Sequence, residues 1–70
     1  MPPDWKPMSE VGSGVNEIRV QAGGQFRVLY VAKFAEAVYV LHAFEKKSRK
    51  TSQRDLEIGR RRYQLIRRGG

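Results

Sequence analysis

The sequence contains no cysteine and only one histidine among its 70 residues. Without cysteine the chain forms no disulfide bond and has no thiol chemistry. One histidine without cysteine is also a poor ligand set for a structural zinc ion. We therefore expect no structural zinc site, and we also expect no cofactor.

Long apolar runs are absent as well. A run such as "VLYVA" is far too short to span a bilayer. The segment "MPPDWKPMSEVGSG" at the start of the chain has neither the basic start nor the apolar run of a signal peptide. These features predict a soluble, cytoplasmic protein that does not bind membranes. A chain of this length forms one domain at most and buries only about 60% of the surface of its unfolded form.

Acidic residues are few, with 7 Asp and Glu against 14 Lys and Arg and a formal net charge of +7. Such an imbalance favours a polyanionic partner, which could be nucleic acid, the ribosome or an acidic protein segment. The alternative is a solvated basic surface that only aids solubility.

The order of sequence patterns predicts three strands and then one helix. All three prolines and two glycines lie within residues 1–14, which indicates an extended lead-in rather than a regular element. A single domain then follows over residues 15–68. Its short connections make the strands antiparallel neighbours, so we expect an α+β fold with a small antiparallel sheet of three main strands. The strands are predicted at 15–21, 25–34 and 37–45, with turns at 22–24 and 35–36.

The C-terminal segment predicts a basic helix that packs on one face of this sheet. Ser52 is a suitable N-cap, and Asp55 three residues later nearly completes a capping box. Gly69-Gly70 ends the helix. Ile58 and Leu65 fall among arginines on the far side of the helix, where they are either ordinary exposed residues or part of a partner surface. The predicted packing stripe consists of Leu56, Gly59, Tyr63 and Ile66.

The two turns fix the strand register. A loop at 22–24 places Arg19 opposite Arg27 and Glu17 opposite Leu29, and a turn at 35–36 places Leu29 opposite His42. The face expected to carry the core and the helix consists of Ile18, Val20, Phe26, Val28, Tyr30, Ala32, Phe34, Tyr39 and Leu41. The other face is expected to carry Glu17, Arg19, Arg27, Lys33 and His42, with Leu29, Val31, Val38, Val40 and Phe44 between them, and Lys46 leaves the sheet on the same side.

Two arginines directly opposite each other destabilise a sheet by a few tenths of a kcal/mol to about 1 kcal/mol. The pair becomes favourable when an anion lies between the side chains, and the planar guanidinium matches a phosphate well. The alternative is that Glu17 neutralises one arginine while water screens the other.

The order and spacing of several short motifs resemble the RelE/HigB-like toxins of bacterial toxin–antitoxin systems, in particular their phage-derived branch. The matching motifs are E-I-R on the first strand, F-R-V-L-Y on the second, and V-Y-V-L-H-A-F on the third. An F-x-K-K loop follows, and T-S-Q-R-D opens the basic helix. The resemblance covers about residues 12–67.

This resemblance implies a metal-independent mRNA endonuclease that acts in the ribosomal A site, where the 2′-OH of the RNA attacks the adjacent phosphate and leaves a 2′,3′-cyclic phosphate. Arg19 and Arg27 would hold the scissile phosphate. His42 is the candidate general base or acid because histidine titrates near neutral pH, with Glu17 as the alternative base. Lys46 would add charge or protonate the leaving oxygen. Further RNA contacts are expected from Lys47, Arg49, Lys50 and Arg54.

The resemblance also implies partners. A separate antitoxin is expected to cover the basic surface, and the substrates are mRNA and the ribosome. Relatives begin with an α-helical hairpin, so this chain is a fragment, has a late start codon or lacks the hairpin. In the last case apolar sheet surface would be exposed, and we expect a homo-oligomer. Two alternatives remain: a truncated, non-catalytic module that binds RNA, DNA or an antitoxin, and a phage structural or assembly protein.

Overall fold

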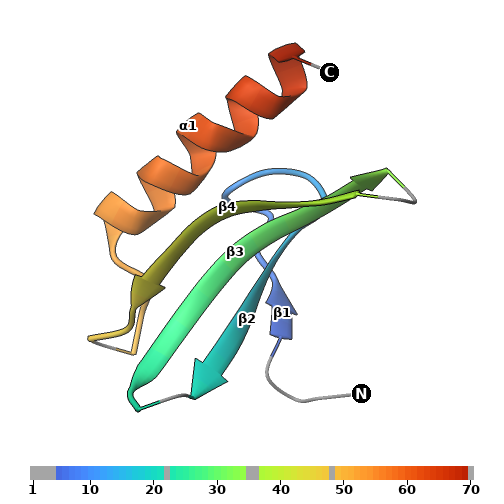
Figure 1. The fold of residues 1–70 in the computed structure, drawn as a ribbon. Helices are drawn as coiled ribbons and strands as arrows, with labels where there is room; N and C mark the ends of the chain where they lie inside the picture. The colour runs from blue at the N-terminus through green and yellow to red at the C-terminus, as the bar shows by residue number, and fades with distance from the viewer. Residues whose placement is uncertain (1–4, 22, 35–36, 48, 70) are drawn as a thin grey trace.

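The computed structural model describes residues 5–21, 23–34, 37–47 and 49–69. Over these residues the chain forms a four-stranded antiparallel sheet in the order β1-β2-β3-β4 and one C-terminal helix, an α+β fold. Figure 1 shows the helix on one side of the open, twisted sheet, alongside β4. The elements are β1 (Trp5–Pro7), β2 (Val15–Gln21), β3 (Gln25–Phe34), β4 (Ala37–Glu45) and α1 (Gln53–Gly69).

The three main strands have the predicted bounds, and the structure adds one short strand. β1 pairs with β2 within the segment that was expected to hold no regular element. Met8 and Val11, which follow β1, are buried in the core. Ala22 and the turn at 35–36 lie outside the described residues, and so do the side chains of Lys33 and Phe34.

The register of β2 with β3 agrees with the prediction, and so does the pairing of β3 with β4 at both of their ends. Arg19 is opposite Arg27, and Glu17 is opposite Leu29. Leu29 is in turn opposite His42. The short connections therefore set the pairing as expected from the sequence.

A β-bulge interrupts the pairing of β3 with β4. Leu29 pairs with His42, but Tyr30 pairs with Val40, so Leu41 has no partner of its own. A bulge inserts one extra residue into one strand and changes which face the following residues occupy. Leu41 is accordingly buried, with 1% of its surface exposed, whereas Val40 is 64% exposed.

The helix covers the opposite face of the sheet from the one predicted. α1 packs over the face that carries Glu17 and Arg27, and these two residues are the buried charged groups of the described chain. The prediction was wrong because charged residues were assigned to solvent, whereas here they neutralise each other. We call this side the helix face; it carries Val15, Glu17, Arg19, Arg27, Leu29, Val31, Tyr39, Leu41, His42 and Phe44.

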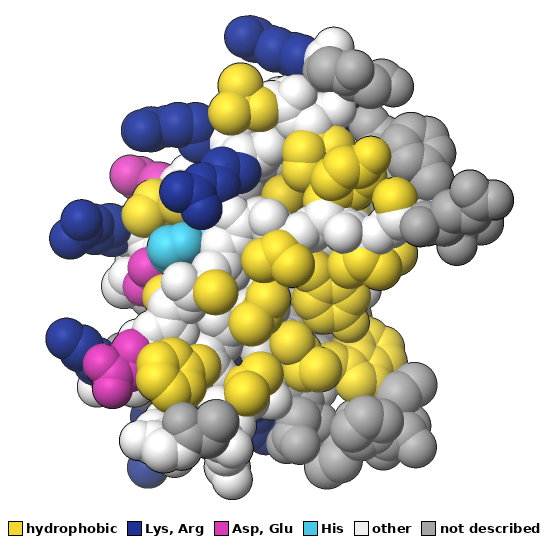
Figure 2. Space-filling model, in the orientation of Figure 1, with side chains coloured by type: hydrophobic (Ala, Val, Ile, Leu, Met, Phe, Trp, Pro, Cys, Tyr) yellow, Lys and Arg dark blue, Asp and Glu magenta, His cyan; other side chains and the backbone are white. Residues whose placement is uncertain are grey.

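The other side of the sheet is covered by no element of the described chain. Several of its apolar side chains are exposed, including Val38 at 63% and Val40 at 64%. Figure 2 shows hydrophobic side chains spread over a part of the surface that lies away from most of the basic residues. We call this side the open face; it carries Ile18, Val20, Phe26, Val28, Tyr30, Val38 and Val40.

The helix packs through the predicted stripe. Leu56 is 6% exposed, and Tyr63 and Ile66 contact the buried core. Gly59 lets the helix approach the sheet closely, because a Cβ at this position would lie 2.9 Å from a methyl carbon of Leu29. Within the described residues, no helix is both long and apolar enough to cross a membrane.

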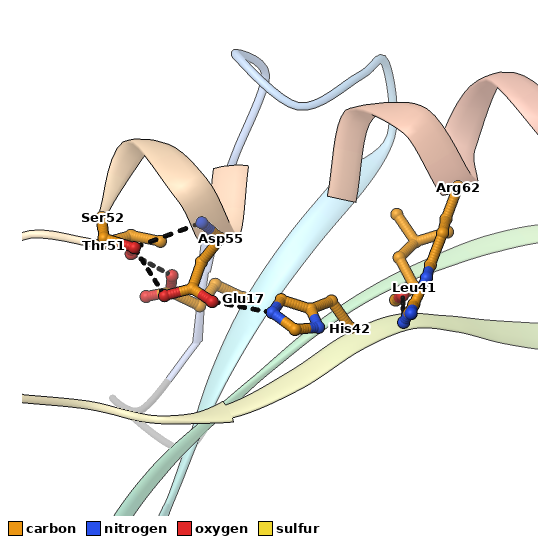
Figure 3. Close-up of polar contacts among 7 residues, drawn as sticks. All are labelled: Glu17, Leu41, His42, Thr51, Ser52, Asp55 and Arg62. Carbon is orange, nitrogen blue, oxygen red and sulfur yellow. Dashed lines mark hydrogen bonds and ion pairs between the residues drawn. The ribbon is translucent and has the colours of Figure 1, made fainter. Parts of the chain in front are cut away.

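Side chains of the helix also hold the backbone of the preceding elements. The Arg60 Nε donates a hydrogen bond to the carbonyl of Glu10 at 2.7 Å. The Tyr63 hydroxyl donates to the carbonyl of Ser13 at 2.9 Å. Arg62 donates to the carbonyl of Leu41, the bulge residue, at 2.9 Å (Figure 3). These bonds fix the 8–14 segment and the bulge relative to α1.

Candidate functional site

A buried ion pair lies at the centre of the helix face. Glu17 on β2 and Arg27 on β3 are diagonal neighbours across the two strands. An Nη1 N–H of Arg27 donates a hydrogen bond to Oε1 of Glu17, and the two residues are only 5% and 1% exposed. Each charge compensates for the desolvation of the other, so a buried ion pair is stable only while both partners are present.

The Glu17 carboxylate also connects two other segments to this pair. Its Oε2 accepts a hydrogen bond of 2.8 Å from the hydroxyl of Thr51, which precedes the helix (Figure 3). Its Oε1 lies 4.0 Å from Nζ of Lys6 on β1. One carboxylate therefore holds β1, β3 and the loop before α1 together.

The Arg27 guanidinium keeps one unused donor. Its Nε is buried and has no hydrogen-bond partner among the described residues. Buried polar atoms are nearly always hydrogen-bonded, so such a donor marks a place where a water or an anion oxygen would be favourable.

Lys46 brings further positive charge to this pair at the end of β4. Its backbone N–H donates to the carbonyl of Gln25 at 2.9 Å, which fixes where the chain leaves the sheet. Partial desolvation lowers the pKa of the Lys46 ammonium, and the charges of Arg27 and Arg19 lower it further. We call Lys6, Glu17, Arg19, Arg27 and Lys46 the charge cluster, since the other four residues all act electrostatically on Lys46 and Glu17 also pairs with Arg27 and Lys6.

The histidine forms a second polar group, also on the helix face. Nε2 of His42 lies 2.8 Å from Oδ1 of Asp55 in the first turn of α1 (Figure 3). The His42 ring also stacks on Phe44, with 4.9 Å between the ring centroids. The histidine side chain is only 14% exposed. Its orientation is therefore fixed from two sides.

Asp55 is itself held by the helix cap. The Ser52 hydroxyl donates to Oδ2 of Asp55 at 2.7 Å and accepts the Asp55 backbone N–H at 3.2 Å. Partial burial alone would raise the pKa of Asp55. The hydrogen bonds to Ser52 and His42, together with the charges of His42 and Arg54, outweigh that effect and lower this pKa below its ordinary value.

The predicted catalytic residues therefore form two groups. Arg19, Arg27 and Lys46 lie together with Glu17, whereas His42 binds Asp55. The expectation that both arginines lie away from the hydrophobic interior was wrong for Arg27, which is buried and paired.

The predicted RNA-binding residues are exposed and surround both groups. Arg49 and Lys47 line a shallow cleft with Lys46, and Lys47 and Arg54 line another beside His42. Ile58 is half-buried and lines the cleft beside His42, while Leu65 is 61% exposed near the end of α1.

Sequence reasoning missed three residues of the site. Asp55 was recognised only as part of the helix cap, although a carboxylate in a first helical turn can also bind a side chain of the sheet. Thr51 and Lys6 gave no signal, because their roles depend on the buried position of Glu17. Among the described residues, no three His, Asp or Glu side chains gather in a way that could hold a metal ion.

The comparison with protein families finds one match. Residues 1–64 match the model of the family described as "Phage derived protein Gp49-like (DUF891)". The chain belongs to this Gp49-like family. The family is associated with RelE-like toxins. No curated protein and no solved structure matches the chain.

Proposed function

We propose that this Gp49-like protein is the toxin of a toxin–antitoxin system and cleaves mRNA on the ribosome. The observation that carries the proposal is the charge cluster, in which a buried arginine is fixed by Glu17 beside two further cations, Arg19 and Lys46. Preorganised cations stabilise the negative charge that develops when a phosphodiester is attacked. The family match supports the toxin part of the proposal.

In this proposal Arg19 and Lys46 contact the scissile phosphate. Arg27 stays paired with Glu17. It contributes its positive charge and its unused Nε donor to the phosphate site from its buried position. A clamp that uses both arginines equally does not fit the buried position of Arg27. Glu17, with both oxygens engaged and 1% exposure, acts as a positioning residue and is unsuited to be the general base.

His42 and Lys46 supply the proton transfers. When Nε2 of His42 donates to Asp55, its other ring nitrogen is free to accept the proton of the RNA 2′-OH. The 2′ oxygen then bonds to phosphorus, and the bond to the 5′ oxygen breaks. Lys46 donates a proton to that leaving oxygen, and its lowered pKa makes it a better acid. The products carry a 2′,3′-cyclic phosphate and a 5′-OH.

The proposed partners bind two different surfaces of the protein. An antitoxin is proposed to cover the exposed cations around the charge cluster, and mRNA in the ribosome is the substrate. The open face is proposed to support self-association, since it exposes Val38 and Val40.

One observation favours a second candidate function. His42 is held by Asp55 at the start of α1 and by the Phe44 ring, which is also what a purely structural histidine would show. A basic module that binds RNA or DNA without cleaving it would keep the charge cluster and use His42 only to fix the helix.

Induced expression in bacteria tests the proposal. The wild-type chain is expected to arrest growth and to leave translated mRNA with 2′,3′-cyclic phosphate ends, detected by end mapping. Arg19→Ala/Lys46→Ala and His42→Asn should remain folded and lose both effects. Arg61→Ala/Arg68→Ala, which removes the same charge from exposed positions of α1, should retain them. Harmless wild-type expression with intact translated mRNA would contradict the nuclease, and a fully active His42→Asn variant would contradict the role of His42.

A further inference from the structure

A further cleft lies between the N-terminal segment and the start of the helix. Its walls come from Lys6 and Pro7 on one side and from Arg49 and Lys50 on the other, with Gln53 of α1 at one end. Its volume of about 420 Å³ lies within the range of small-ligand sites.

Both walls of this cleft are held in place by hydrogen bonds. On one side, the Met8 N–H donates to the carbonyl of Val15 at 2.8 Å, and Arg60 donates to the carbonyl of Glu10. On the other side, Thr51 is bound to Glu17. The cleft is therefore formed before any ligand arrives.

The lining combines an apolar floor with a cationic rim. Met8 and Leu56 form the floor and belong to the core. Three cations stand at the rim, with Glu10 as the acid of the same lining. Gln53 supplies an amide that can donate and accept hydrogen bonds at once. A ligand with a flat, weakly polar ring and an attached phosphate fits this combination.

The cleft and the charge cluster share residues. Lys6 lines the cleft and also lies 4.0 Å from Glu17, and Thr51 lines the cleft while it donates to the same carboxylate. A single-stranded RNA whose phosphate rests on Arg19 and Lys46 can therefore extend along Lys6 into the cleft.

We propose that this cleft binds the nucleotide next to the scissile phosphate. The base lies over the apolar floor with its edge on Gln53, and its phosphate contacts Lys6 and the 49–50 segment. This inference rests on the proposed function and adds a base-reading site to it. Single-stranded RNA is commonly recognised through splayed bases that are stacked and hydrogen-bonded along their edges.

The test uses RNA that the protein cannot cleave. Short single-stranded RNA with 2′-O-methyl groups and a fluorescent label is titrated with the full chain, and binding is followed by anisotropy. In a matched series, one base at a time is replaced by an abasic sugar, which keeps every phosphate. One position is expected to lose about fivefold in affinity when its base is removed. In Gln53→Ala this loss should shrink, and in Gln64→Ala, which changes an exposed glutamine farther along α1, it should persist.

Equal affinity for intact RNA and for every abasic RNA would overturn the inference, because cations alone bind phosphates without regard to bases. An unchanged base effect in Gln53→Ala would overturn the assignment to this cleft. These outcomes do not depend on cleavage. A base effect that needs Gln53 in a protein that never cuts RNA would support the cleft and contradict the nuclease.

Discussion

Arg27 donates a hydrogen bond to Glu17, and both side chains are almost completely buried. This relationship connects the fold to the proposed chemistry. The carboxylate holds the arginine at a fixed place, and the other cations of the charge cluster lie near this pair. One guanidinium of the basic surface, that of Arg27, is therefore held in a fixed position.

The first prediction concerns the removal of this carboxylate charge. Glu17→Gln leaves the Arg27 charge buried without its partner, which costs about 3–5 kcal/mol. The free energy of unfolding of so small a domain is of similar size. Urea denaturation followed by circular dichroism should show a large loss of stability or an unfolded chain.

The control replaces both partners at once. Glu17→Leu/Arg27→Met removes both charges and keeps apolar volume, so it should be much more stable than Glu17→Gln. If the double variant is as unstable as the single one, the ion pair is not what makes Glu17 important.

The second prediction concerns pH and Asp55. The pKa of Asp55 is lower in the folded protein than its ordinary value of 3.8. Its stabilising effect is therefore complete above that ordinary value and is lost as the pH falls through the lowered pKa. Asp55→Asn should cost about 0.5–1 kcal/mol at neutral pH, and the difference from wild type should vanish in acid.

Urea denaturation at a series of pH values measures this difference. Glu57→Gln is the matched control, since it removes a carboxylate from an exposed position of the same helical turn. A constant difference between wild type and Asp55→Asn from neutral pH down to about pH 2 would contradict the assignment of the charge effect to Asp55.

The third prediction concerns the contact of the helix with the 8–14 segment. A Cβ at Gly12 would lie 2.6 Å from the Tyr63 ring, and that ring is anchored by its hydroxyl on Ser13. Gly12→Ala should therefore cost about 1–3 kcal/mol, measured by thermal or urea unfolding. Gly24→Ala, whose Cβ would meet nothing closer than 3.4 Å, should cost clearly less. Equal losses would show that Tyr63 moves freely.

The fourth prediction concerns the open face. Exposed apolar patches of this kind promote association. Light scattering coupled to size exclusion is expected to show dimers or larger species, and Val38→Ser/Val40→Ser should shift them toward monomer. Leu65→Ser, which removes a similarly exposed apolar side chain from the helix, should leave the distribution unchanged. A clean wild-type monomer at micromolar concentrations would contradict self-association.

Much of the fold could be predicted because local signals determine it. The turns set the register that places Arg19 opposite Arg27, and Ser52 and Asp55 mark the start of the helix. The helical stripe through Leu56 and Tyr63 also packs as expected.

Which face of the sheet the helix covers could not be predicted, because it depends on pairings between residues that are distant in the sequence. Both faces of the sheet carry apolar side chains, and charge was used to choose between them. That choice fails when Glu17 and Arg27 neutralise each other in the interior. The bulge at Leu41 also reverses the faces of neighbouring β4 residues, and nothing in the sequence marks it. Burial of the pair then brings Thr51 to Glu17, which no spacing pattern could reveal.

The most direct test of the central claim is the salt dependence of RNA binding. Anisotropy titrations with non-cleavable single-stranded RNA compare the wild type with Arg19→Ala/Lys46→Ala and with Arg61→Ala/Arg68→Ala, two variants of equal net charge. Loss of two phosphate contacts should reduce the slope of log K against log salt by about 1.4, and only the charge-cluster variant should show this change. Equal loss of affinity and slope in both variants would mean that the phosphate is held by diffuse positive charge and not by the cations around Glu17 and Arg27.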